Sequence, residues 1–143
     1  MNHQIREKSN TIRAQSVYLS YHTFPDRKGN TCGPVGVADN NTIPDARMTA
    51  SSVFLMSDDF YASYLGRLKE TRGRGAWCPE TKFNRTDYLQ VDMGSVLSVC
   101  AVATQGGEEL LEWTTSYKLR LSIDGLTWNT YEETNKTKVW KYQ

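Results

Sequence analysis

The alternation of apolar and polar residues from Tyr117 to Ile123 is the feature that most limits how this chain can fold. Apolar side chains occupy every second position and charged or hydroxyl side chains stand between them. An extended strand with this pattern has one apolar face and one polar face. Asp124-Gly125 follows directly and suits the positive φ angles of a tight turn, and the alternation resumes over Leu126 to Thr130. The segment therefore predicts a β-hairpin that packs on a core through one face.

Other segments from Cys32 onward have a similar pattern of alternation and short apolar runs. Tyr88 to Met93 alternates, ends at Gly94 and is followed by the apolar run Val96 to Ala103, which predicts two further core strands. Short apolar runs broken by Gly, Pro, Asn and Asp recur, and no stretch is periodic enough for a major helix. A chain of 143 residues is long enough for one core. We predict an all-β sandwich or barrel.

The first part of the chain differs from the rest in composition and pattern. Residues 1–31 are polar, carry both histidines (His3 and His22) and lack a sustained pattern, although Val17 to Tyr21 could form a short strand. We expect residues 1–31 to be a tail or linker and residues 32–143 to be the folded domain. The start lacks the apolar stretch of a signal peptide, and no apolar run of about 18 residues could span a bilayer.

Charge and residue inventory argue against several function classes. Lys and Arg number 17 and Asp and Glu 16, which gives a formal net charge of +1 and no global field for nucleic acid or an acidic membrane. Both histidines lie outside the predicted domain, and the chain has no Gly-rich phosphate loop or His-rich metal spacing. We therefore expect no enzyme activity and no resident metal, and we expect any electrostatic partner to be recognised locally. Acidic pairs are common enough that the inventory alone leaves a paired-carboxylate hydrolase open.

The cysteines and sequons do not decide whether the protein is extracellular or lies in a reducing compartment. Cys32, Cys78 and Cys100 lack Cys-x-x-Cys spacing. In an extracellular protein at least one of three thiols must be unpaired or bonded outside this chain, whereas in a reducing compartment all three can be small buried residues. Candidate glycosylation sites, which suit a secreted surface, are Asn40, Asn84 and Asn135.

A series of motifs then resembles the discoidin family, also called coagulation factor V/VIII type C domains. The matching segments, in order, are Cys32–Val37, Ile43–Asp45, Met48–Ser52, Gly75–Pro79, Tyr88–Gly94, Ala103–Gly106, Glu112–Leu119 and Ser122–Trp128. Gly66 to Leu68 followed by Gly75 to Glu80 is especially similar to the discoidin domain receptors. The resemblance implies a jelly-roll-like, galactose-binding-domain-like β-sandwich with ligand-binding loops, or spikes, at one end.

The resemblance also implies a function. Family members bind glycans, phospholipid head groups, collagen or other proteins, and their binding domains are not enzymes. The leading expectation is an extracellular module for cell adhesion or matrix recognition that binds a glycan or protein. Alternatives are a phospholipid-binding module, a collagen-binding receptor ectodomain fragment and a structural fragment without a ligand. Collagen binding is weakened because Phe54, Arg74 and Gly107 stand where the receptors have Trp, Asp and Arg.

The family pattern would continue beyond Gln143 through closing strands. Its disulfides imply that Cys32 and Cys78 pair with cysteines in that later part. We therefore expect an incomplete domain that lacks its last strands, with unpaired backbone groups along a sheet edge.

Three spikes contain candidate contacts. On the first, Phe54, Leu55 and Met56 either insert into a ligand or, for Phe54 and Met56, fold back on the core. On the second, Arg72 and Arg74 belong to a basic cluster that also contains Arg67 and Lys69. Guanidinium groups can grip carboxylate, sulfate or phosphate, although a solvated loop is the alternative.

The third spike contains Gly107, Leu110 and Leu111. The two leucines resemble the paired leucines of lipid-binding clotting-factor domains, but Glu108, Glu109 and Glu112 surround them. The carboxylates argue against an anionic membrane unless Ca²⁺ intervenes, for which Glu108 and Glu109 could supply oxygens. A solvated acidic turn is the alternative.

The remaining prominent residues have structural explanations. We expect Trp77, Trp113 and Trp128 to pack in the core with their indole N–H groups satisfied locally. Asp45, Asp92 and Asp124 are expected in turns, where they accept hydrogen bonds from loop backbone.

Overall fold

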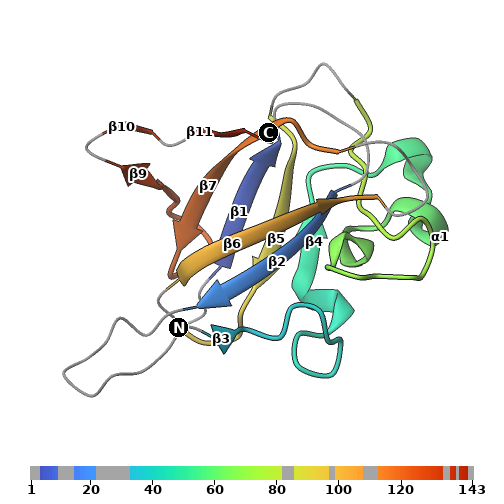
Figure 1. The fold of residues 1–143 in the computed structure, drawn as a ribbon, viewed down its shortest axis with the longest axis horizontal. Helices are drawn as coiled ribbons and strands as arrows, with labels where there is room; N and C mark the ends of the chain where they lie inside the picture. The colour runs from blue at the N-terminus through green and yellow to red at the C-terminus, as the bar shows by residue number, and fades with distance from the viewer. Residues whose placement is uncertain are drawn as a thin grey trace.

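The computed structural model describes residues 4–9, 15–21, 33–81, 86–96, 99–107, 113–133, 136–137 and 139–141. These residues form a β-sandwich in which a three-stranded sheet crosses in front of a six-stranded one (Figure 1). Its helical segments are short and gather beside β4 at one end of the molecule. The predicted all-β class is confirmed.

The large sheet has the order β11-β7-β1-β5-β4, with β8 paired to β7, and all its pairs are antiparallel. Its strands are β1 (Gln4–Ser9), β4 (Met48–Ala50), β5 (Tyr88–Asp92), β7 (Ser116–Ser122), β8 (Asn129–Thr130) and β11 (Val139–Lys141). The smaller sheet has the order β3-β2-β6, built from β2 (Gln15–Tyr21), β3 (Gly33–Pro34) and β6 (Val99–Gly106). A separate pair joins β9 (Glu132–Glu133) to β10 (Lys136–Thr137).

The helical segments lie between β4 and β5 or just before β4. They are η1 (Asp45–Arg47), η2 (Phe54–Met56), α1 (Asp58–Tyr61) and η3 (Ser63–Gly66). Each covers three or four residues, so they act as compact loop structure.

A hairpin joins β7 and β8 as predicted, but its loop covers residues 123–128 and β8 contains only Asn129 and Thr130, so the predicted tight turn and the strand from Leu126 to Trp128 do not form. Gly125 has φ +73°, and Asp124 Oδ1 accepts backbone hydrogen bonds from Leu126 (2.8 Å) and Thr127 (2.7 Å). These bonds, first that of Thr127, lower the pKa of Asp124 to about 2. The turn role predicted for Asp124 is therefore confirmed. The other predicted strands also form, although β6 begins at Val99, because a turn at Gly94 (φ +72°) leaves Val96 half-exposed.

The core lies between the two sheets. Its buried members are Val37, Ile43, Met48, Trp77, Leu89, Val91, Met93 and Leu119. Trp77 is 1% exposed, and its Nε1 donates to the Ser52 carbonyl oxygen at 2.9 Å, as predicted. Trp128 is half-buried and donates to the Gly125 carbonyl oxygen at 3.2 Å. Trp113 was expected in the core but is 46% exposed, because it precedes the start of β7 and Tyr117 and Leu119 fill the inner face of that strand.

The N-terminal segment departs most from expectation. Strand β1 lies between β5 and β7 and pairs with both, from Gln4 opposite Asp92 and Ser122 to Lys8 opposite Tyr88 and Lys118. Strand β2 pairs with β6 and includes the predicted Val17–Tyr21 strand. The prediction of a tail is wrong for these two segments. The ladder uses backbone groups that every non-proline residue carries, so a polar segment can complete a sheet whose neighbouring strands need partners.

We predict that Arg6→Pro destabilises the whole sandwich. Arg6 stands opposite Gln90 on one side and Arg120 on the other, and proline has no N–H for the ladder. An unsatisfied buried backbone group costs about 1–3 kcal/mol, so the free energy of unfolding in urea should fall by at least that amount. Arg6→Thr keeps the N–H group and is the control. Equal unfolding midpoints for the two variants would show that β1 is not part of the stable sheet.

Candidate functional site

The first spike holds two apolar side chains away from the core. Leu55 is 67% exposed and Met56 is 89% exposed. Both residues have left-handed backbone, with φ 54° and 48°, a conformation that costs of the order of 1–3 kcal/mol for residues other than glycine. The surrounding structure must therefore fix this turn. The alternative in which Met56 folds back onto the core does not occur.

Hydrogen bonds hold the backbone of this turn. The Phe54 N–H donates to the Cys78 carbonyl oxygen at 2.8 Å, and the Met56 N–H donates to that of Val53 at 3.0 Å. The Phe54 ring is half-buried and lies edge-on to Tyr61, with centroids 5.5 Å apart. Phe54 thus anchors the spike while Leu55 and Met56 protrude from it.

A buried carboxylate fixes the base of the spike. Ser51 Oγ and Ser52 Oγ each donate to Asp87 Oδ1 at 2.8 Å, and Asp87 is 4% exposed. The two hydroxyls in turn accept backbone N–H groups from Tyr88 and Glu80, both at 3.0 Å. The Ser-Ser pair of the family motif therefore ties the base of the spike to the chain that follows the core tryptophan, at Glu80 and at Asp87–Tyr88.

The second spike packs directly on α1. The Arg74 N–H donates to the Phe60 carbonyl oxygen at 3.1 Å, and the Arg74 guanidinium carbon lies 5.8 Å from the Phe60 ring centroid. Gly73 has φ +56°, and a Cβ at this position would lie 2.7 Å from the Asp59 carbonyl oxygen. Only glycine allows this approach. Arg74 therefore lies against half-exposed Phe60 of α1, the helix that directly follows the first spike in the chain.

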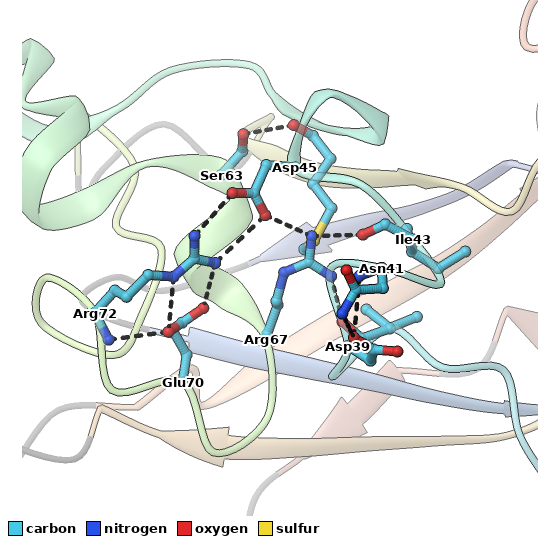
Figure 2. Close-up of polar contacts among 10 residues, drawn as sticks. Asp39, Asn41, Ile43, Asp45, Ser63, Arg67, Glu70 and Arg72 are labelled. Atoms are coloured by element: carbon cyan, nitrogen blue, oxygen red, sulfur yellow. Dashed lines mark hydrogen bonds and ion pairs between the residues drawn. The ribbon is translucent and has the colours of Figure 1, made fainter.

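A network of ion pairs and hydrogen bonds supports the second spike (Figure 2). Arg67 is 1% exposed, and its Nη2 lies 2.8 Å from Asp45 Oδ1 and donates to the Ile43 carbonyl oxygen at 2.7 Å. Its Nη1 donates to the carbonyl oxygen of Val37. The position of Asp45 after Pro44 is as predicted, but its carboxylate serves two arginines in addition to its place at the start of η1.

Arg72 completes the network. Its Nη1 lies 2.9 Å from Asp45 Oδ2, its Nη2 lies 2.7 Å from Glu70 Oε2, and its Nε donates to Glu70 Oε1 at 3.1 Å. Hydrogen bonding to Arg72 lowers the pKa of Asp45, and it lowers that of Glu70 against the opposing effect of burial. The two carboxylates raise the pKa of Arg72. The Arg72 guanidinium is thus engaged within the protein, and the predicted ligand contact of this residue stays a prediction.

A small polar cavity of about 190 Å³ lies beside this network. Its lining residues are Ala38, Asp39, Asn40, Arg67, Glu70 and Arg72. The charges of Arg67 and Arg72 are balanced by those of Asp39 and Glu70. The cavity wall therefore carries no excess positive charge for a phosphate or sulfate.

Several predicted residues are placed only in part. Gly107 follows β6, while Glu108, Glu109, Leu110, Leu111, Cys32, Asn84 and Asn135 lie outside the described residues. Cys78 is buried, with its Sγ 3.7 Å from the Pro79 carbonyl oxygen, and Asn40 is exposed in a turn. The predicted disulfides, glycosylation and calcium contacts stay predictions. Among the described residues, no three His, Cys, Asp or Glu side chains gather as metal ligands, and no helix is long and apolar enough to span a membrane.

Sequence reasoning missed Phe60 and Glu70 as parts of the site. Phe60 stands in a short polar stretch that has no periodic signal, and only its contact with Arg74 shows its place. Glu70 lies two residues before Arg72, a spacing that could have indicated a local ion pair.

The fold and the protruding spike define a ligand-binding β-sandwich module. The chain belongs to the F5/8 type C domain, or discoidin, family, whose model matches residues 47–143. This is a family of binding modules rather than enzymes.

Two relatives illustrate the range of the family. Lactadherin of Mus musculus is 36% identical over 114 residues, which cover 76% of this chain and 24% of that protein. Epithelial discoidin domain-containing receptor 1 of Homo sapiens is 38% identical over 104 residues, which cover 69% of this chain and 11% of the receptor. The chain thus spans a quarter or less of these relatives. No solved structure matches it significantly.

We predict that Arg72→Ala lowers stability near neutral pH and that the difference from the parent protein shrinks in acid. Asp45 and Glu70 have lowered pKa values in the folded state, so their contribution is present above their unfolded pKa values of about 4 and is lost as pH falls through the lower folded values. Urea unfolding between pH 7 and pH 3 measures this effect.

Arg47→Ala is the matched control, because Arg47 is exposed and has no ion pair among the described residues. A difference between parent and Arg72→Ala that stayed constant across this pH range would contradict the network as its cause.

Proposed function

We propose that this chain is an extracellular adhesion or matrix-recognition module that docks on a phospholipid membrane surface by inserting Leu55 and Met56. The observation that carries the proposal is the exposure of these two adjacent side chains, 67% and 89%, on a turn with left-handed backbone. The family implies an extracellular setting, and one of the matched relatives is named a receptor.

The energetics fit a weak, reversible contact. Burial of a large aliphatic side chain contributes about 1.5–3 kcal/mol, so the two together contribute about 3–6 kcal/mol. A dissociation constant of 1 mM corresponds to about −4.1 kcal/mol. The first spike alone therefore gives an affinity near millimolar or somewhat tighter. Leu110 and Leu111 of the third spike are proposed as further anchors, with calcium at Glu108 and Glu109 as a proposed aid.

The chemistry of the spike favours lipid over the other ligand classes. Glycan sites use directional polar groups, whereas Leu55 and Met56 offer only apolar surface, and the Arg74 guanidinium lies over the half-exposed Phe60 ring. A protein ligand would need a groove shaped to these two side chains, and a lipid interface would not. Collagen binding is disfavoured by the Phe54, Arg74 and Gly107 replacements.

The test is flotation of the protein with phospholipid vesicles. The double variant Leu55→Ser with Met56→Ser should lose at least about 90% of vesicle binding, because about 3–6 kcal/mol of apolar burial is removed. The matched control is Leu126→Ser, since Leu126 is 86% exposed but follows the end of β7, which lies on the other side of the molecule from α1 (Figure 1).

Vesicle binding unchanged in the double variant would overturn the proposal. If the parent protein binds no vesicles but the double variant loses binding to a matrix protein, the spike serves a protein ligand instead.

A further inference from the structure

We infer that the outer face of the large sheet is a second binding surface, and that it binds a sulfated polysaccharide through a block of four cationic positions on β1 and β7. The outer face is the face of the large sheet that is turned away from the small sheet. This inference goes beyond the proposed membrane contact, because it uses none of the residues of the first spike.

Strand pairing brings the four cationic positions together. Strands β1 and β7 lie side by side in the large sheet (Figure 1), with Arg6 directly opposite Arg120 and Lys8 directly opposite Lys118. Positions directly opposite each other share one face of a sheet, and so do positions two apart along a strand. Adjacent strands lie about 4.8 Å apart, and two residues of an antiparallel strand span about 6.8 Å. Neighbouring positions of the block are therefore closer than the Debye length of about 8 Å at physiological ionic strength.

The burial of neighbouring residues shows which face carries the block. Leu119 on β7 and Leu89 and Val91 on β5 are buried in the core between the two sheets. Lys118 and Arg120 alternate with the buried residues of β7 and are half-buried. Because successive side chains of a strand point to opposite faces, Lys118 and Arg120 belong to the outer face.

The positions that flank the block in the same two rows of the ladder are uncharged. They are Val139 and Tyr88 in the row of Lys118, and Thr130, Gln90 and Thr49 in the row of Arg120. Among the described residues of this face, the nearest carboxylate in the ladder is that of Asp92, in the next row, and its Oδ1 accepts the Gly94 N–H at 2.9 Å.

The cations of β7 are not neutralised as those of the second spike are. Among the described residues, neither Lys118 nor Arg120 takes part in an ion pair, and Arg120 Nη2 donates to the Trp128 carbonyl oxygen at 3.2 Å. A carbonyl oxygen satisfies a donor without cancelling its charge. The formal net charge of the whole chain is only +1, so the block concentrates positive charge on one face.

This arrangement is unfavourable without a counter-charge. Like charges directly opposite each other destabilise a strand pair, and the ladder between β1 and β7 contains two such pairs in consecutive rows. A bound polyanion would relieve the repulsion. Because the block exists only when the two strands are paired, such a ligand would bind the folded state and stabilise it.

The shape and chemistry of the surface favour a sulfated polymer. Ammonium and guanidinium groups bind sulfate through charge-assisted hydrogen bonds. Sites for small ligands are concave, whereas a sheet face presents its charges in rows, which suits a linear chain with repeated sulfate groups. In the strand order, β5 separates the block from β4, beside which the helical segments and the first spike lie. The extracellular setting that the family implies favours a polysaccharide over nucleic acid.

The experiment measures binding of the full chain to heparin, a sulfated polysaccharide, by titration calorimetry at low and physiological salt. Lys118→Gln with Arg120→Gln should weaken binding by about two- to thirtyfold, because each exposed ion pair contributes up to about fivefold. Arg6→Gln with Lys8→Gln keeps the backbone N–H groups of β1 and should weaken binding by a similar factor. Added salt should weaken binding of the parent protein. Heparin should also raise the unfolding temperature of the parent more than that of either variant.

The matched control is Lys69→Gln with Arg74→Gln, which removes the same two kinds of charge from the second spike. This control should bind heparin as the parent protein does. The Lys118 and Arg120 variant should unfold at the same urea concentration as the parent or a higher one, because repulsion between opposite like charges is removed. Its loss of heparin binding is then not a loss of fold.

Four outcomes would overturn the inference. They are absence of heparin binding by the parent protein, heparin binding that neither sheet variant weakens, an equal loss in the control, and tighter binding to an oligonucleotide or to phosphatidylserine vesicles than to heparin. The Leu55→Ser, Met56→Ser variant should keep its affinity for heparin. Failure of the proposed membrane contact would therefore leave the heparin result unchanged, and the two failures are distinguishable.

Discussion

The buried guanidinium of Arg67 is the contact on which the loops beside β4 depend. It joins the carbonyl oxygens of Val37 and Ile43 to the carboxylate of Asp45, and so fixes the loop before β4. A buried charge is tolerated only when it is paired and hydrogen-bonded, because water cannot solvate it. Asp45 then holds Arg72 on its second oxygen, and the second spike is attached to the core through that carboxylate.

Backbone contacts connect this network to the exposed first spike. Gly73 allows the second spike to approach α1, and Arg74 donates to the Phe60 carbonyl oxygen. On the other side of the spike, the Ser51 and Ser52 hydroxyls hold Asp87. Left-handed backbone at Leu55 and Met56 persists because both flanks are fixed. A flexible loop would relax and bury part of this apolar surface against its own chain.

The sequence predicted best where the structure is local. Alternation over Tyr117–Ile123 and the Asp124-Gly125 pair specify the hairpin through neighbours in the chain. The sequence predicted poorly those pairings in which the two strands are far apart in the chain. Strand β1 carries no strong pattern, since its place between β5 and β7 depends on backbone groups of strands 80 or more residues away, from Lys8 opposite Tyr88 upward. Trp113 looked like a core residue because motif position does not reveal where β7 begins.

The same limit explains the candidate site. The sequence grouped Phe54, Leu55 and Met56 as candidate contacts, but it could not separate Phe54, which packs against Tyr61, from Leu55 and Met56, which protrude. A basic cluster counted along the chain suggested an anion-binding surface. Folding brings Asp45 and Glu70 onto Arg67 and Arg72 and removes that excess charge. The paired arginines thus serve the scaffold, because each guanidinium is held by carboxylates of the protein itself.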